Sequence, residues 1–132
     1  MPVQLEMTLR LLLAAVLGGI IGFQREMYGK PAGLRTLALI GVGAGLFGVI
    51  SQLSFPGGNP SMIAAGVVTG VGFLGAGAIL HRHGGVEGLT TAATIWVAAC
   101  VGLAAGAGLY ILAPAVTVMA FLILLLPQKK QK

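Results

Sequence analysis

Long stretches of this chain contain almost no charged residue, and this feature limits the folds available to it. Five stretches are apolar enough to cross a lipid bilayer, which takes about 20 mostly apolar residues in a helix. They cover residues 8–23, 34–50, 62–80, 89–106 and 110–126. Only 8% of all residues are charged, whereas soluble domains carry roughly 25%. The sequence therefore predicts an all-α integral membrane protein, a bundle of about five transmembrane helices.

The basic residues predict how this bundle is oriented. Most of them flank the first and third connections or follow the last helix: Arg25, Lys30, Arg35, Arg82, Lys129, Lys130 and Lys132. Because basic residues gather on the cytoplasmic side of membrane proteins, we expect a cytoplasmic C-terminus and an external N-terminus. Arg10 is the one basic residue at the other end. This distribution explains the net charge of +5, and nucleic acid is not expected as a partner.

An internal repeat relates two helix hairpins. At a shift of 55 positions, residues 22–44 match residues 77–99 with nine identities. The match includes a Gly-Leu-x-Thr sequence that opens the second and fourth apolar stretches, beginning at Gly33 and Gly88. Both hairpins enter the membrane from the same side, so the sequence predicts a parallel repeat.

The glycine-rich stretch 66–80 is predicted to form the central helix of the bundle. One third of its residues are glycine, and in lipid such a run still forms a helix because its backbone must be bonded internally. Glycines four apart allow another helix to approach closely. The glycines expected to serve helix packing are Gly66, Gly70, Gly72, Gly75, Gly77 and Gly88.

A candidate polar cluster lies at the side predicted to face the cytoplasm. Its members are Arg25, Glu26, Arg35, Thr36, Glu87, Thr90, Thr91 and Thr94. One interpretation is structural, with carboxylates neutralising helix ends and arginines paired or reaching lipid phosphates. The other is a cavity that binds an ion, a lipid head group or a partner protein. Arg35 favours this one, since a basic side chain inside an apolar helix is costly unless it is paired or reaches the interface. In the structural interpretation, the expected partner of Arg35 is Glu26 or Glu87.

The sequence offers little for catalysis. His81 and His83 are two residues apart and have no third His or Cys nearby, so a zinc site is not expected. The three acidic residues provide little for acid–base chemistry or for a magnesium-dependent reaction. No nucleophile motif and no phosphate-binding loop is present. We therefore expect no enzyme and no cofactor, and leave the metal ligands, if any, unassigned.

Four motifs together resemble the MgtC/SapB family of bacterial inner-membrane proteins. They are GFQRE at 22–26, GKPAGLRT at 29–36, GVGFLGAGAIL at 70–80 and GLTTAATIW at 88–96, in the family's order. The resemblance implies a protein of the cytoplasmic membrane with about five spans. It also implies a link to magnesium limitation and, in pathogens, to survival in host cells. Family members have been associated with magnesium uptake, with membrane potential and with restraint of the F-type ATP synthase.

Two departures limit what the resemblance implies. Many members have Glu where this chain has Gln24, which weakens the case for a cation site. The virulence factors also carry a soluble C-terminal domain, whereas we expect a single transmembrane domain over residues 1–132 here.

Three functions follow as hypotheses. The first is ion homeostasis in low magnesium through modulation of another membrane complex, by a chain that is itself a homo-oligomer. The second is a transporter or channel for magnesium or another ion. The third is a structural protein that binds membrane lipid. Few polar residues lie at the span centres, and this disfavours a pore for a divalent cation within one subunit.

Overall fold

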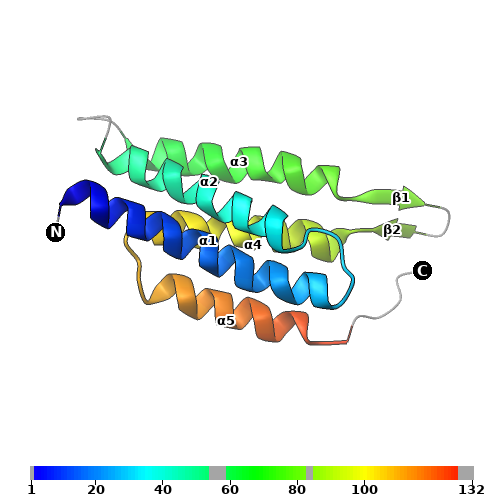
Figure 1. Cartoon of the computed structure of the whole chain (residues 1–132). Helices are drawn as coiled ribbons and strands as arrows, with labels where there is room; N and C mark the ends of the chain where they lie inside the picture. The colour runs from blue at the N-terminus through cyan, green and yellow to red at the C-terminus, as the bar shows by residue number, and fades with distance from the viewer. Residues whose placement is uncertain (1, 54–58, 83–84, 128–132) are drawn as a thin grey trace.

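The chain folds as a helical bundle with one small β-hairpin (Figure 1). The computed structural model describes residues 2–53, 59–82 and 85–127, and within them no side chain from 80 to 87. In this part of the chain there are five α-helices and two strands. They are α1 (Val3–Met27), α2 (Leu34–Leu53), α3 (Pro60–Gly77), β1 (Leu80–Arg82), β2 (Gly85–Glu87), α4 (Leu89–Gly106) and α5 (Leu112–Leu124). The predicted all-α membrane bundle is confirmed.

Four of these helices, α1 to α4, are long and apolar enough to cross a membrane. The fifth, α5, has 13 residues, about 20 Å at 1.5 Å per residue, and is shorter than the predicted stretch 110–126. Its last turn tightens, because the N–H of Leu125 bonds to Leu122 O at 3.1 Å, and Pro127 follows. With its flanking turns, α5 still runs alongside α1, so the chain begins and α5 ends at opposite ends of the bundle (Figure 1).

The connection between α3 and α4 is a β-hairpin. Strands β1 and β2 pair antiparallel, with Leu80 opposite Glu87 and Arg82 opposite Gly85. The predicted helix 62–80 ends early, at Gly77, because the N–H of Ala78 turns back to Gly75 O at 3.0 Å. The hairpin extends beyond the ends of the helices (Figure 1). His83 and Gly84, residues 54–58 of the second connection and the basic tail 128–132 lie outside the described residues.

Helix α4 is the centre of the bundle, and the prediction that the glycine-rich helix is central is wrong. Helix α4 contacts each of the other four helices. It buries nine of its residues, among them Ile95, Ala98 and Val101. Helix α3 buries only Val67 and Gly75. In Figure 1, α3 lies at one edge of the bundle and α5 at the other, with α1, α2 and α4 between them.

Glycines on α1, α2 and α4 hold these three helices at backbone distance. A Cβ atom on Gly22 would lie 2.6 Å from Gly33 O, where α1 meets the start of α2. On α4, a Cβ atom on Gly102 or Gly106 would overlap the carbonyl oxygen of Gly41 or Gly45. Helices this close gain dispersion contacts along their whole length, which is the main driving force for association in lipid.

The glycines of α3 are used differently from the prediction. A Cβ atom on Gly66, Gly70, Gly72 or Gly77 would meet no atom within 4 Å. These four glycines therefore do not bring α3 against another helix of the same chain. Gly75 does lie near α4, with Ala92 O at 3.4 Å from its virtual Cβ, and Gly88 has a φ of +93° at the N-cap of α4.

The parallel repeat is visible in the fold, although its two halves pack differently. Helices α2 and α4 begin at Leu34 and Leu89, the positions that the shift of 55 relates, and they run in the same direction (Figure 1). In the first half α1 lies tightly against α2, whereas in the second half α3 is mostly exposed. The equivalent of Gly18, which touches Leu37 O, is the exposed Phe73.

The orientation in the membrane stays a prediction, and reporter fusions can test it. The described Arg25, Lys30 and Arg35 lie at the end of the bundle where α5 ends, so this end is expected to face the cytoplasm. Alkaline phosphatase fused after Pro127 should be inactive, and the same enzyme fused after Gln52, at the opposite end, should be active. An active fusion after Pro127 would reverse the orientation.

Candidate functional site

The one buried charge in the described part of the chain belongs to Arg25, in the last turn of α1. Its side chain is 5% exposed. Its Nε and Nη2 donate to Pro31 O at 3.3 and 3.2 Å, and Nη2 also donates to the hydroxyl of Thr91 at the start of α4. Arg25 thus joins α1, the α1–α2 connection and α4 through neutral oxygen atoms.

The α1–α2 connection is shaped to cover this guanidinium. Gly29 and Ala32 have positive φ values of 65° and 61°, so the chain turns back sharply after α1. The N–H of Lys30 bonds to Arg25 O at 2.9 Å. This fold of the connection places the carbonyl of Pro31 against the Arg25 side chain and shields it from the aqueous side.

Two threonines of the predicted cluster are buried on α4, and one of them, Thr91, contacts Arg25. Thr91 and Thr94 are 4% and 5% exposed. The hydroxyl of Thr94 donates to Thr90 O at 2.7 Å, the usual way in which a helix satisfies a buried hydroxyl. Arg25 thus contacts Thr91 directly, and Thr90 and Thr94 lie in the first two turns of the same helix, α4.

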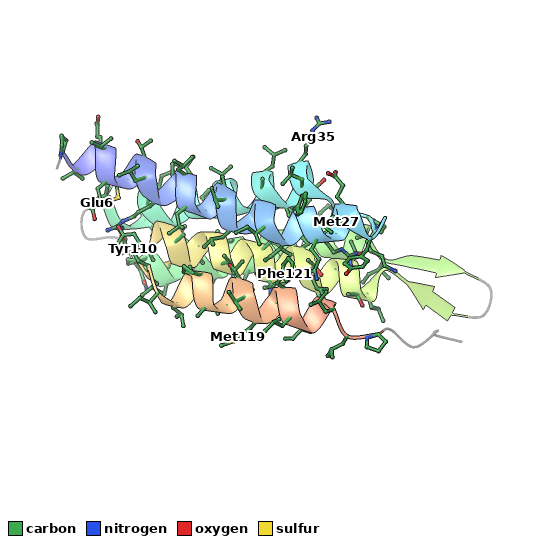
Figure 2. All side chains as sticks on the ribbon, turned by 60° about the horizontal axis from the view of Figure 1, so that its bottom comes forward. Glu6, Met27, Arg35, Tyr110, Met119 and Phe121 are labelled. Atoms are coloured by element: carbon green, nitrogen blue, oxygen red, sulfur yellow. The ribbon has the colours of Figure 1, made fainter. Side chains whose placement is uncertain are left out.

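The other members of the predicted cluster lie outside this group. Glu26, Arg35 and Thr36 are exposed, and Figure 2 shows Arg35 projecting away from α2. Arg35 forms no ion pair with any described side chain, so the expected pair with Glu26 is wrong. Glu87 lies in β2, and its side chain is outside the described part. The residue that is held deep in the bundle is Arg25 and not Arg35.

Gln24 is a buried polar residue that the predicted cluster did not include. It is 1% exposed, and its Nε2 donates to Phe121 O at 3.0 Å. This carbonyl is at the end of α5, where the N–H of Leu125 has turned to Leu122 O, so Gln24 caps α5 from the neighbouring helix. Its Oε1 is buried without a partner. The only sequence signal for this contact was that this chain has Gln24 where many family members have Glu.

Replacing Gln24 by leucine is expected to loosen α5. The substitution removes the only side-chain donor that the structure gives to Phe121 O, and a lost hydrogen bond to a buried carbonyl costs about 1–3 kcal/mol. The change also removes the unpartnered Oε1, which places the expected loss at the lower end of this range. Thermal unfolding of the Gln24→Leu variant in detergent measures it. Leu122→Ala on the exposed side of α5 is the control, and an equal or larger loss there would contradict the cap.

A second polar cluster, not anticipated from the sequence, lies at the opposite end of the bundle. Arg10 Nη2 lies 3.2 Å from Glu6 Oε1, Arg10 Nε donates to the hydroxyl of Tyr110 at 2.8 Å, and Nη1 donates to Gln52 Oε1 and Gly106 O at 3.1 Å each. Figure 2 shows Glu6 and Tyr110 at this end. Only the spacing of Glu6 and Arg10 was a local signal, because Gln52 and Tyr110 are far away in sequence. The cluster ties α1, α2 and the α4–α5 connection together.

Neither cluster provides the ligands of a metal site. Among the described residues there is no group of three or more His, Cys, Asp or Glu side chains that could hold a metal ion. The buried polar side chains are Gln24, Arg25, Thr91, Thr94 and Thr117. This set is neutral or cationic, and it offers hydrogen bonds and one fixed positive charge.

Comparisons with known proteins agree with the resemblance. The model of the MgtC family matches residues 11–132. The chain is 50% identical over 127 residues to the protein of Escherichia coli strain K12 named "Putative magnesium transporter YhiD", covering 90% of this chain and 59% of that protein. It is 50% identical over 96 residues to Protein MgtC of Brucella abortus strain 2308, covering 73% of this chain and 40% of that protein.

A third relative, an uncharacterized protein of Haemophilus influenzae, is 44% identical over 120 residues, 83% of this chain and 50% of that protein. The chain thus spans about half the length of the curated relatives that it matches. No solved structure matches it significantly. Because the family model covers nearly the whole chain, including α2 to α5 and most of α1, this multi-pass bacterial membrane protein belongs to the MgtC family.

Proposed function

We propose that this chain serves adaptation to low magnesium in the bacterial inner membrane by modulating another membrane complex such as the ATP synthase. Its family and the names of its relatives support a magnesium-related membrane protein. Modulation is preferred over conduction because of the buried polar side chains at one end of the bundle, Gln24, Arg25, Thr91 and Thr94. Their one charge is the cation Arg25, held by neutral oxygens.

A magnesium path needs a different lining. Mg²⁺ prefers oxygen ligands, usually one or two carboxylates with several retained waters, and cation channels use rings of acidic side chains. No carboxylate is among the buried polar side chains of the described part, which are Gln24, Arg25, Thr91, Thr94 and Thr117. A fixed guanidinium at one end of the bundle repels a divalent cation. Conduction through one copy of this chain is therefore disfavoured.

A surface for contact with another complex is available at the same end. Glu26, Arg35 and Thr36 are exposed there, and the hairpin of β1 and β2 extends past the helices (Figure 1). These groups are positioned by the rigid α1–α2 pair and by α4. An end that combines exposed charges of both signs with a protruding hairpin suits a reversible contact at the membrane surface.

Two measurements test the proposal. In inverted membrane vesicles from a strain that lacks its own family member, ATP-driven proton pumping should fall when this chain is expressed, and growth in low magnesium should be restored. Liposomes that contain the purified chain and an entrapped magnesium indicator should take up no more Mg²⁺ than empty liposomes. Unchanged proton pumping in a strain whose growth is restored would contradict modulation of the ATP synthase.

The alternative is a magnesium transporter, and it is favoured by the name of the Escherichia coli relative. Uptake of Mg²⁺ into the liposomes, driven by a gradient and proportional to protein content, would support this function over modulation. The predicted homo-oligomer stays a prediction. Light scattering of the purified chain in detergent measures its mass and tests it directly.

A further inference from the structure

An apolar groove runs along the outside of the bundle between α2 and α3. Its volume is about 840 Å³, and all of its lining residues are apolar. It exists because three of them are glycines without side chains to fill it. A Cβ atom on Gly43, Gly66 or Gly70 would meet no atom within 4 Å. The edges are formed by larger side chains that are themselves exposed, such as Leu39 and Leu74.

The only charged side chain aligned with this groove on α2 is Arg35. Arg35 and Leu39 are four residues apart and therefore neighbours on the surface of α2, and Leu39 lines the edge of the groove. Arg35 therefore stands one turn beyond the groove, at the end of the bundle that carries Arg25 and Lys30. Its side chain is exposed and projects freely (Figure 2), without an ion pair to any described residue.

We propose that this groove binds one anionic phospholipid, with an acyl chain between α2 and α3 and the phosphate group at Arg35. The site is independent of the proposed function. Basic residues beside pockets between transmembrane helices on the cytoplasmic side are suited to anionic head groups. An arginine at this depth reaches the membrane interface with its guanidinium while its methylene groups stay in the apolar region.

The length of the groove fits a lipid of one leaflet. From Leu39 to Ile50 on α2, eleven steps at 1.5 Å per residue give about 17 Å. Half of the hydrocarbon core of a bilayer is about 15 Å. An acyl chain whose head group is held at Arg35 thus ends where the groove ends.

Charge favours a lipid over a second copy of the chain. A two-fold axis along the membrane normal would bring two copies of the groove together and place both Arg35 side chains at the same depth. The lining offers no acidic group to pair with them, so the two arginines would repel each other. An anionic phospholipid supplies the missing negative charge and fills the groove at the same time.

Lipid binding to the purified, delipidated chain tests the site. Dioleoyl phosphatidylglycerol and dioleoyl phosphatidylcholine have the same acyl chains, and native mass spectrometry can count how much of each is retained. The wild-type chain should prefer the anionic lipid about fivefold, since one arginine near the membrane surface contributes about 1 kcal/mol. Arg35→Ala should abolish this preference. Lys30→Ala removes an exposed positive charge at the same end but off the groove, and it should leave the preference intact.

Two glycine variants test the groove itself. Gly70→Leu places a side chain in the groove and should lower the retention of both lipids at least tenfold. Gly72→Leu makes the same change on another face of α3, where a Cβ atom also meets nothing within 4 Å, and should retain both lipids. Both variants have room for the new side chain, so both are expected to fold, and their thermal unfolding in detergent verifies this.

Three results would overturn the proposal. One is equal retention of the two lipids by the wild-type chain, or a preference that Arg35→Ala leaves unchanged. Another is equal retention by the Gly70→Leu and Gly72→Leu variants. The third is a dimer of the wild-type chain that Gly70→Leu alone converts to a monomer, because a second copy would then occupy the groove.

Discussion

The Gly102→Val substitution is expected to prevent the bundle from assembling. Any Cβ atom at this position overlaps the carbonyl oxygen of Gly41, and this neighbour is backbone that cannot rotate away. Helices α2 and α4 would have to separate, which also breaks the contact of Gly106 with Gly45 one turn further on. We expect a loss of more than about 3 kcal/mol, beyond the usual range for an overpacked core. Size-exclusion chromatography and thermal unfolding in detergent measure the folded fraction.

The Gly72→Val substitution is the matched control. It also replaces a glycine by valine within an apolar helix, but at a position where a Cβ atom meets nothing within 4 Å. Its effect is limited to helix propensity, less than about 1 kcal/mol. If the two variants lost stability equally, the backbone contact between α2 and α4 would not be the centre of the bundle.

The second large effect is expected for Arg25→Ala. This change removes the group that donates to Pro31 O and to the hydroxyl of Thr91, and it leaves a void between α1 and α4. The threonine hydroxyl can turn to its own helix, but the carbonyl of Pro31 stays without this donor. We expect a loss of about 2–4 kcal/mol, seen as a lower unfolding temperature in lipid-free detergent.

Arg35→Ala controls for the loss of a positive charge at the same end of the bundle. Arg35 is exposed, so in lipid-free detergent its removal should change stability by no more than about 0.5 kcal/mol. A double-mutant cycle of Arg25→Ala with Thr91→Val should be non-additive, because both changes break the same hydrogen bond. Equal stability of the Arg25→Ala and Arg35→Ala variants would show that the buried guanidinium does not hold the helices together.

The choice between Arg25 and Arg35 illustrates what sequence patterns leave open in a membrane protein. Both residues stand near a helix end beside glycines and a loop. In a soluble protein the apolar face of each helix would reveal which arginine points inward. In lipid the outer face is as apolar as the core, so the periodicity carries no such signal. The contacts that bury Arg25 come from Pro31 and Thr91, and the second of these is 66 positions away.

The glycine pattern had the same ambiguity. Gly66 and Gly70 are four residues apart, as are Gly41 and Gly45, and Gly102 and Gly106. The spacing indicates that a helix can be approached closely, and not which helix approaches it. The strong features, namely long apolar stretches, a shift of 55 between two Gly-Leu-x-Thr openings and basic connections, predicted the bundle and its parallel halves. The identity of the central helix could not be predicted in this way, because it depends on contacts between segments that are far apart in the sequence.

The paired glycines of α2 and α4 also fix the position of the two helices along each other. Gly41 faces Gly102 and Gly45 faces Gly106, so the two points of close approach are one helical turn apart on both helices. A shift of α4 along α2 by one turn, about 5.4 Å, would in one direction bring Ala98 against the backbone of α2. In the other direction, Gly45 of α2 would lie beyond the end of α4 at Gly106 and would have no glycine opposite it. The two glycine contacts therefore favour the observed register. The peripheral helices α3 and α5, which bury two residues each, are not part of this backbone contact, which fixes α4 against α2.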